Sequence, residues 1–184
     1  MAWTPITWQD LINTIAAPDS NDLTKNAGVS GDWDADARSV QELASAAAGA
    51  GIRFEIMPAL AGATGVGLSS SNPTPHWDTI DYCILQWAGD TPTLQIYELG
   101  VLVFDSGGMT YELYEISINA LGQIEYRELQ TNTLLYTSLA PPSFPLFVDC
   151  SLDIYGWRIN DVLIETGVVP PPAKIDHLMM MGVH

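Results

Sequence analysis

The sequence predicts an all-β protein, an antiparallel β-sandwich of the jelly-roll kind with a short C-terminal arm. About ten short apolar or alternating runs follow one another along the chain, with turn residues between them, and this pattern is typical of a sandwich or barrel. No helical pattern of about 10 to 15 residues alternates with these runs, as a parallel α/β sheet would require. With 184 residues, of which 47% are hydrophobic and 15% charged, the chain can form one well-filled core.

The expected strands begin near Gly51 and are separated by glycine, proline and asparagine turns. The run 123–129 alternates most clearly, because Ile124 and Tyr126 would lie on one face and Glu125 and Arg127 on the other. The expected strands are 52–57, 64–69, 80–87, 93–99, 101–104, 111–119, 123–129, 134–138, 146–150 and 156–165.

Two segments near the N-terminus do not fit the strand pattern. Residues 10–16 are compatible with one amphipathic turn. The run Ser39-Val40-Gln41-Glu42 before an alanine-rich stretch matches a capping box at the start of a helix. Alanine alone would form the apolar face of that helix, so little burial would hold it in place. We therefore expect two short or irregular elements here.

The sandwich domain is expected to span residues 1–167 and to be followed by a proline-rich linker and apolar tail, residues 168–184. Three consecutive prolines, Pro170 to Pro172, remove backbone donors and favour an extended arm. The tail carries the apolar cluster Leu178, Met179, Met180 and Met181, which is costly to expose to water. It could form a strand on the same domain, or it could dock on a neighbouring subunit.

The charge balance excludes several classes of partner. Six Lys and Arg stand against 22 Asp and Glu, a formal net charge of −16. This charge would repel the phosphates of nucleic acids and an anionic membrane surface, so neither is an expected partner. No apolar run reaches the roughly 18 residues that span a bilayer. The first residues contain no basic segment before an apolar stretch, so no Sec-type signal peptide is predicted.

No metal or cofactor site is predicted. His76, His177 and His184 are far apart in the sequence and far from both cysteines, which argues against zinc. Asp32, Asp34 and Asp36 have the spacing that opens a calcium loop, but Ala37 and Leu43 stand where an EF-hand needs Gly and Glu. A solvated acidic turn is the preferred interpretation, and calcium binding in another loop type is the alternative.

Cys83 and Cys150 each lie in an apolar run. Buried free thiols are therefore expected, and a disulfide between the two is the alternative.

The sequence does not predict an enzyme. It contains no nucleophile elbow, no P-loop and no complete dinucleotide-binding fingerprint. Glycoside hydrolysis needs two carboxylates placed across the scissile bond from each other, which positions on the same face of one strand can supply. Glu112 and Glu115 are an odd number of positions apart and would point to opposite faces of a regular strand, and so would Asp78 and Asp81.

A glycan-binding loop is the most suggestive feature. His76, Trp77 and Asp78 follow the segment 72–75, which contains two prolines, so a tryptophan with polar neighbours would stand on a stiffened loop. Packing of Trp77 in the core is an equally good interpretation. Trp87 and Tyr97 lie within expected strands and are predicted to be core residues. Trp157, which precedes Arg158, completes the set of candidate glycan-binding residues, although either role fits it.

A set of ordered motifs in this chain resembles a known family. The motifs are Asn21 to Asn26, Gly31 to Trp33, Ser39 to Gln41, Val66 to Ser69, Ile80 to Tyr82, Leu94 to Gly100, Tyr126 with Leu134 to Ser138, and Phe144 to Leu152. Together they resemble the concanavalin A-like lectin/glucanase domains of bacterial secreted proteins and phage virion proteins, and the likeness spans about Trp3 to Glu165.

This resemblance implies a lectin-like sandwich, but that fold carries lectins, enzymes and structural modules alike. The enzymes of the family resemble one another in an E-x-D-x-x-E or E-x-D-x-E strand. In this chain the nearest segment, Glu115 to Asn119, has Ser117 and Asn119 where later acids belong, which weakens a catalytic role. Asn132-Thr133 replaces the family's Asn-Gly turn, so a longer or strained hairpin is expected there.

Two functions are consistent with these observations. The first is a non-enzymatic structural or adhesion module of a phage or similar particle, such as a capsid decoration, tail or fibre component, that also binds glycans. Its partners would be other virion subunits or copies of itself, as a homo-oligomer. The second is a free, extracellular carbohydrate-binding module of a bacterial secreted protein, in which Trp77 would be the main contact.

Overall fold

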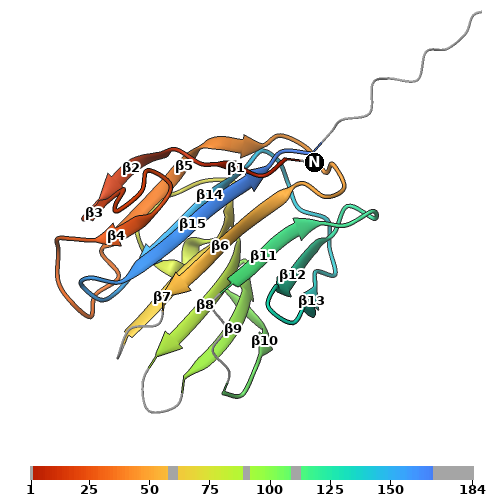
Figure 1. The fold of residues 1–184 in the computed structure, drawn as a ribbon. Coiled ribbons are helices and arrows are strands. Elements are labelled where there is room, and N and C mark those ends of the chain that lie inside the picture. Colours follow the sequence, from red (N-terminus) through yellow and green to blue (C-terminus); the bar gives the residue numbers. More distant parts are fainter. Residues whose placement is uncertain (1, 58–61, 89–91, 109–112, 168–184) are drawn as a thin grey trace, which may run out of the picture.

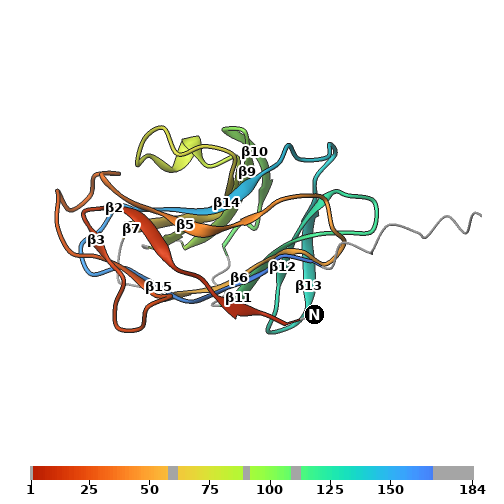
Figure 2. The ribbon, with the colours of Figure 1, turned by 90° about the horizontal axis from the view of Figure 1, so that it is seen from above.

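The computed structural model describes residues 2–57, 62–88, 92–108 and 113–167, which form two antiparallel β-sheets packed face to face (Figures 1 and 2). Each of the ten expected runs contains a strand, so the all-β sandwich is confirmed. The tail with Leu178 to Met181 lies outside the described residues. Among the described residues, no helix is long and apolar enough to cross a membrane.

The larger sheet has eight strands in the described part of the chain, and its central strands are β6 and β15. Along the sheet the order is β13 (Thr133–Thr137), β12 (Ile124–Glu128), β11 (Leu113–Ile118), β6 (Gly51–Met57), β15 (Arg158–Glu165), β4 (Leu23–Lys25) and β3 (Thr14–Ile15). The short strand β1 (Thr4–Pro5) also pairs with β15.

The second sheet has seven strands in the described part of the chain and carries the site described below. Its order is β10 (Val101–Asp105), β9 (Thr93–Glu98), β8 (Tyr82–Ala88), β7 (Gly62–Ser69), β14 (Leu146–Leu152), β5 (Ala35–Leu43) and β2 (Trp8–Ile12). The strands β7 to β10 pair in chain order, whereas β14 lies between β7 and β5, both distant from it in sequence. That half of the sheet therefore brings together residues that no local pattern relates.

Alternation along the strands produces one main core between the sheets. Ile52, Phe54 and Ile56 on β6 and Val148 and Cys150 on β14 are fully buried and belong to this one core. The intervening residues of the seven-stranded sheet point to its other side, which we call the outer face. An apolar side chain of this size gains about 1.5 to 3 kcal/mol by full burial, so the core fixes which residues reach the outer face.

The two segments that did not fit the strand pattern contain strands, so the amphipathic turn and the helix start are wrong. The expectation of short or irregular elements holds for the two-residue strand at Thr14–Ile15 and for residues 44–50, which form neither helix nor strand. Residues 10–16 fall on β2 and β3, and the break between them is at Asn13, whose φ is 51°. Ser39 lies within β5 and caps no helix, because its hydroxyl accepts from Val148 N and donates to Gln41 O. Small inward residues, Ala35 and Ala37, gave this strand too weak an alternation to detect.

The expected long hairpin between β12 and β13 is confirmed. Residues 129–132 connect the strands, and Asn132 has a φ of 56°, in the region that favours glycine or asparagine. Glu128 is buried and organises the turn by accepting hydrogen bonds from Gln130 N and Thr131 N.

A long connection covers part of the outer face of the seven-stranded sheet. Residues 70–81, here called the cover loop, join β7 to β8 and contain the single-turn 3₁₀ helix Trp77–Thr79. In Figure 2 the cover loop, drawn yellow-green, lies on the side of this sheet that faces away from the other sheet. Glycines on β7 permit this approach, since a Cβ on Gly65 would lie 3.0 Å from Trp77 Cβ.

Candidate functional site

The cover loop and the sheet beneath it enclose a second, smaller apolar cluster. Ala63, Ile80, Cys83 and Leu85 are buried there, separate from the main core. Trp33, Trp77 and Tyr97 pack against this cluster and are only partly buried. The cluster therefore forms a firm base on which aromatic side chains stand at the protein surface.

Five rings meet above this base and form what we call the aromatic cluster: Trp33, His76, Trp77, Trp87 and Tyr97. Trp77 meets Tyr97 edge-on with ring centroids 4.5 Å apart, and His76 lies 5.8 Å from Trp77. Trp33 lies 6.2 Å from both Trp77 and Trp87. Tilted and edge-on pairs at these separations are favourable arrangements of aromatic rings.

The aromatic cluster draws on four separate parts of the chain. His76 and Trp77 come from the cover loop, and Trp33 comes from the connection between β4 and β5. Trp87 and Tyr97 come from β8 and β9 and point to the outer face. The prediction that Trp87 is a core residue is therefore wrong, because it is 37% exposed.

Polar groups border the rings. His76 Nδ1 lies 2.6 Å from Asp78 Oδ1, and both side chains are exposed to solvent. Tyr97 Oη donates to Gln95 Oε1 at 3.1 Å, and Gln95 Nε2 donates to Asp105 Oδ2 at 2.9 Å. Partial burial and the nearby Asp105 raise the pKa of Tyr97, so its hydroxyl stays neutral and can donate.

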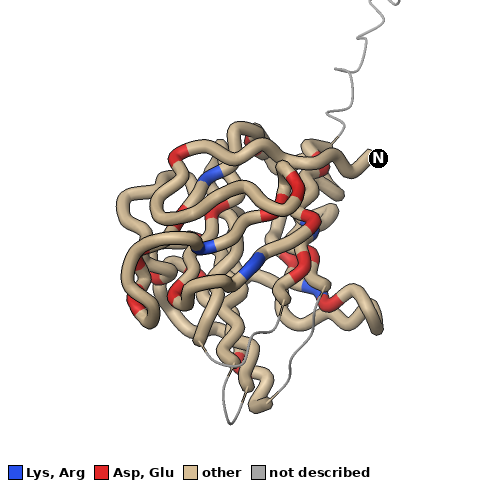
Figure 3. The backbone as a smooth tube through the Cα atoms, turned by 60° about the vertical axis from the view of Figure 1, so that its left-hand side comes forward, with Lys and Arg blue, Asp and Glu red and all other residues tan. Residues whose placement is uncertain are grey.

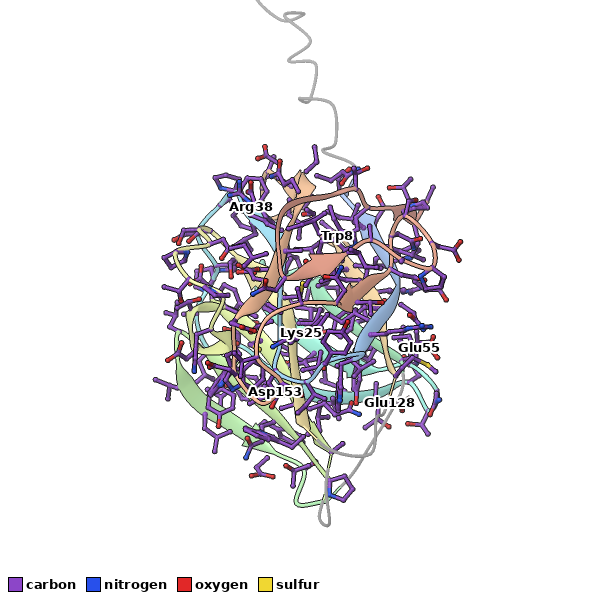
Figure 4. All side chains as sticks on the ribbon, turned by 90° about the vertical axis from the view of Figure 1, so that its left-hand side faces the viewer. Trp8, Lys25, Arg38, Glu55, Glu128 and Asp153 are labelled. Atoms are coloured by element: carbon purple, nitrogen blue, oxygen red, sulfur yellow. The ribbon has the colours of Figure 1, made fainter. Side chains whose placement is uncertain are left out.

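A buried lysine positions the connection that carries Trp33. Lys25 Nζ is fully enclosed and donates to the carbonyl oxygens of Val29, Asp32 and Asp153 at 2.7 to 2.9 Å. It also forms a 2.5 Å ion pair with Asp34 Oδ1. Figure 4 shows Lys25 and Asp153 close to each other. The connection 26–34 is thus wrapped around one ammonium group.

The contact between Lys25 and Asp34 determines how the acidic turn at residues 32–36 is arranged. Asp34 turns inward to Lys25, whereas Asp36 lies on β5, so the acids at 32, 34 and 36 do not converge on one point. Burial alone would raise the pKa of Asp34, but hydrogen bonds from Lys25 and from Val29 N outweigh it and lower that pKa. Across the described residues, no group of three or more His, Cys, Asp or Glu side chains is arranged to hold a metal.

The carboxylates weighed for catalysis are engaged with neighbours where the structure describes them. Glu115 pairs with Arg53 at 2.7 Å, and Asp78 lies 2.6 Å from His76 Nδ1. Asp81 accepts from both Ser70 N and Ser70 Oγ at 2.8 Å. Glu112 lies outside the described residues. The described acids therefore act within the fold, as hairpin, strand-pair and loop contacts.

The structure brings together three of the four predicted glycan-binding residues. His76, Trp77 and Asp78 lie side by side on the cover loop, at the edge of the aromatic cluster. Trp157 is 1% exposed and belongs to the main core, so its ring is not available to a ligand at the surface. Both cysteines are free and buried, as expected.

Sequence reasoning missed Trp33 and misplaced Trp87 and Tyr97. A period of two indicates that the residues of β8 and β9 alternate between faces, but it does not show which face the main core covers. Trp33 could have been found from its sequence neighbours, because it stands between two aspartates, and a tryptophan in such a turn is rarely a core residue.

Searches with protein-family models and against curated proteins find no match to this chain. Solved structures do match. The PSpry domain of TRIM65 aligns with a TM-score of 0.59 and 16% identity, over 88% of this chain and 90% of that one. The exoplasmic/lumenal domain of VIP36, solved in a Ca2+/Man2-bound form, aligns with a TM-score of 0.56 and 9% identity, over 92% and 84%.

A legume lectin-like domain from Entamoeba histolytica aligns with a TM-score of 0.50 and 10% identity, over 86% of each chain. At such identities the similarity concerns the fold. The chain thus has the concanavalin A-like sandwich fold that its motifs predicted.

Proposed function

We propose that this protein is a non-enzymatic, glycan-binding adhesion module, and that the aromatic cluster on the outer face of the seven-stranded sheet is its binding site. One observation carries the proposal. Three tryptophans, a tyrosine and a histidine from four parts of the chain meet at the surface, above their own apolar base. Folding alone does not require Trp87 to remain 37% exposed.

The chemistry of the cluster suits a sugar ring. The flat, apolar faces of Trp77 and Trp87 can stack on the C–H face of a pyranose, and amphipathic aromatic side chains lose little entropy on binding. Asp78, Gln95 and the Tyr97 hydroxyl supply acceptors and donors for sugar hydroxyls at the rim. A few placed polar groups around an apolar surface are typical of ligand sites.

The charge of the protein narrows the ligand class. Acidic residues are spread over the fold (Figure 3). Most of the basic residues in the described parts of the chain already form an ion pair with an acid. A sulfated or uronic-acid glycan would be repelled by this field. Neutral hexose-containing glycans are therefore the proposed ligands.

The proposal includes no catalysis. Two described acids that border the cluster are already engaged, because Asp78 contacts His76 and Asp105 contacts Gln95. Hydrolysis needs one protonated and one ionised carboxyl on either side of the bond. Binding without turnover is the activity that these side chains support.

The finer part of the proposal concerns the setting. The motifs resemble those of phage virion proteins, so we place the module on a phage or similar particle, as a decoration, tail or fibre component. Exposed apolar side chains on and before the edge strand β10, namely Leu99, Val101 and Leu102, offer a surface for a neighbouring subunit. The alternative is a free carbohydrate-binding module of a secreted protein.

A glycan array tests the binding site, followed by titration of the best neutral glycan. Trp77→Ala and Trp87→Ala should each lower the affinity by about tenfold, which corresponds to about 1.4 kcal/mol. Trp3→Ala is the matched control, because Trp3 lies over Arg53 of β6, in the other sheet. The proposal fails if the parent binds no glycan. It also fails if Trp77→Ala and Trp87→Ala bind the glycan as tightly as the parent does.

Sedimentation velocity tests the setting. The full chain and a chain ending at Gly167 should differ, with the full chain forming a defined oligomer if the tail docks on a neighbouring subunit. A monomer in both cases would instead favour the free module. Sedimentation is independent of the glycan array, so either result can stand alone.

A further inference from the structure

The cover loop rests on two buried carboxyl groups next to the aromatic cluster. Asp36 on β5 is 1% exposed and Asp149 on β14 is 2% exposed. The two strands are paired, with Ser151 opposite Asp36 and Arg38 opposite Asp149. The acids therefore sit diagonally on the outer face, where their carboxyl groups are within hydrogen-bonding reach of each other.

Nothing on the neighbouring strands neutralises this pair. Arg38 faces Asp149 across the strands, but its Nη2 lies 3.2 Å from Asp10 Oδ2 and its guanidinium stacks 4.5 Å above the Phe147 ring. No ion pair in the described part of the chain reaches Asp36 or Asp149. Around the pair, the titratable and charged groups are Asp10 on β2, Arg38 on β5, Asp81 on the cover loop, Cys83 on β8 and Cys150 on β14.

Three buried acceptor atoms around the two carboxyl groups have no hydrogen-bond donor. Asp36 Oδ1, Asp149 Oδ2 and Asn72 Oδ1 are all buried acceptors without a hydrogen-bond partner. Asn72 belongs to the cover loop and lies within reach of Asp36. An ionised carboxylate can only accept, whereas a protonated one has an O–H to donate. One added proton would supply the missing donor.

The electrostatics favour that proton. Burial, above all, raises the pKa of Asp149 well above its usual value, and the adjacent Asp36 and Asp81 raise it further. Burial also raises the pKa of Asp36 to about 6. Two carboxyl groups this close cannot both ionise cheaply in a site that excludes water.

We propose that Asp36 and Asp149 share one proton and form a pH-dependent latch beneath the cover loop. With the proton bound, the O–H of one carboxyl donates to the other, a single negative charge remains, and the loop docks on the sheet through the contact of Asn72 with Asp36. Without it, two buried negative charges repel each other, and the loop loosens over β7 and β14.

Besides the latch, Ser151 Oγ donates to Pro75 O, and Asp81 N donates to Ser69 Oγ at 3.1 Å. Ile80 and Trp77 hold the second half of the loop on the sheet. The loop also carries His76 and Trp77. Where the proposed function holds, glycan binding would therefore tighten at mildly acidic pH, although the latch itself is independent of any glycan.

The sign of the pH effect follows from proton counts. The ordinary pKa of an aspartate is 3.8, so above that value the folded protein binds more protons at this pair than the unfolded chain does. Stability is then greatest at acidic pH and is lost as the pH rises through the folded pKa values. The unfolding equilibrium constant should rise by up to about tenfold per pH unit for each proton released.

Hydrogen exchange and thermal unfolding, both without glycan, test the latch between pH 5 and pH 8. In the parent, exchange in the cover loop, corrected for the intrinsic effect of pH, should increase about tenfold or more toward pH 8, and the melting temperature should fall. Asp149→Asn keeps the shape, supplies an N–H donor and removes one of the two charges, so both measurements should depend clearly less on pH than in the parent; the buried Asp36 still titrates. Asp36→Asn is the second variant in case Asp149→Asn does not fold.

Glu42→Gln is the matched control, because it removes an exposed carboxylate from the same strand, β5. It should keep the parent's pH dependence. The latch is refuted if the parent shows no pH dependence, or if both asparagine variants retain the parent's slope. It is also refuted if 1 mM calcium restores the acidic-pH stability at pH 8 in the parent alone, since the pair would then be a cation site.

Discussion

Trp77 and Tyr97 meet edge-on with their ring centroids 4.5 Å apart, although one belongs to a loop and the other to a strand beneath it. The contact exists because the cover loop lies on the outer face of β7, where Gly65 leaves room for Trp77 Cβ. The position of the cover loop, and with it the aromatic cluster, thus depends on the absence of a side chain on β7.

A graded series at Gly65 tests this dependence. An alanine Cβ would lie 3.0 Å from Trp77 Cβ and 3.3 Å from Cys83 Sγ, closer than ordinary contact. Gly65→Ala should cost about 1 kcal/mol and Gly65→Val about 2 to 3 kcal/mol, by overpacking. Tryptophan fluorescence and glycan affinity should change in the same order. Equal stability and unchanged fluorescence in Gly65→Val would show that the loop does not rest on β7.

Removal of the Lys25 ammonium should destabilise the fold strongly. Lys25→Met would leave several carbonyl oxygens and the Asp34 carboxylate without their shared donor, at a cost of about 3 to 5 kcal/mol. Asp34→Asn is the comparison. It should cost only about 1 kcal/mol, because Asp34 is 28% exposed and the carbonyl acceptors keep their lysine. Urea unfolding measures both, and similar costs for the two variants would contradict this account.

The stability of the parent should pass through a maximum between about pH 4 and pH 6. On the acid side, Asp34 and Glu128 have lowered pKa values, because hydrogen bonds to each carboxylate outweigh its burial. Their contribution is present above the ordinary pKa and is lost as the pH falls through the folded one. On the alkaline side, Asp36 and Asp149 have raised pKa values, so their contribution to stability is lost as the pH rises through those values. Melting temperatures from pH 2 to pH 8 measure this profile, and a steady rise to pH 8 would contradict it.

Both thiols should be unreactive in the folded protein. Cys83 and Cys150 are fully buried, and burial raises the pKa of each well above its usual value. The thiolate is the reactive form, so Ellman's reagent should modify neither cysteine until denaturant is added, and should then modify both. Rapid reaction of one thiol in the native state would show that its segment opens locally.

Much of the sandwich could be predicted from the chain. From β6 to β15, apolar side chains alternate with polar ones between clear turn residues, so each expected run contains a strand. The first part of the chain gave no such signal. Ala35 and Ala37 are core residues of β5, but alanine contributes little contrast to an alternating pattern. There the helix-start signal of Ser39 was stronger than the strand signal.

The candidate site could be predicted only where it is local. His76, Trp77 and Asp78 are consecutive, so a stiffened loop with an aromatic residue indicated them directly. Trp33 lies in the connection just before β5 and joins the same cluster through tertiary packing. No spacing in the sequence relates it to Trp87. The sequence neighbours of Trp157 fitted a core residue and a surface residue equally well. The pairing of β15, which begins at the next residue, with β4 and β6 places Trp157 in the core.

The lysine enclosed by the connection 26–34 has a consequence for the conditions under which the module works. Lys25 supplies its positive charge from the chain itself, so the connection that presents Trp33 needs no dissolved ion to keep its shape. We expect EDTA to leave the melting temperature and the tryptophan emission unchanged. Such a site would operate equally well in ion-poor water and in media where citrate or phosphate binds free divalent ions.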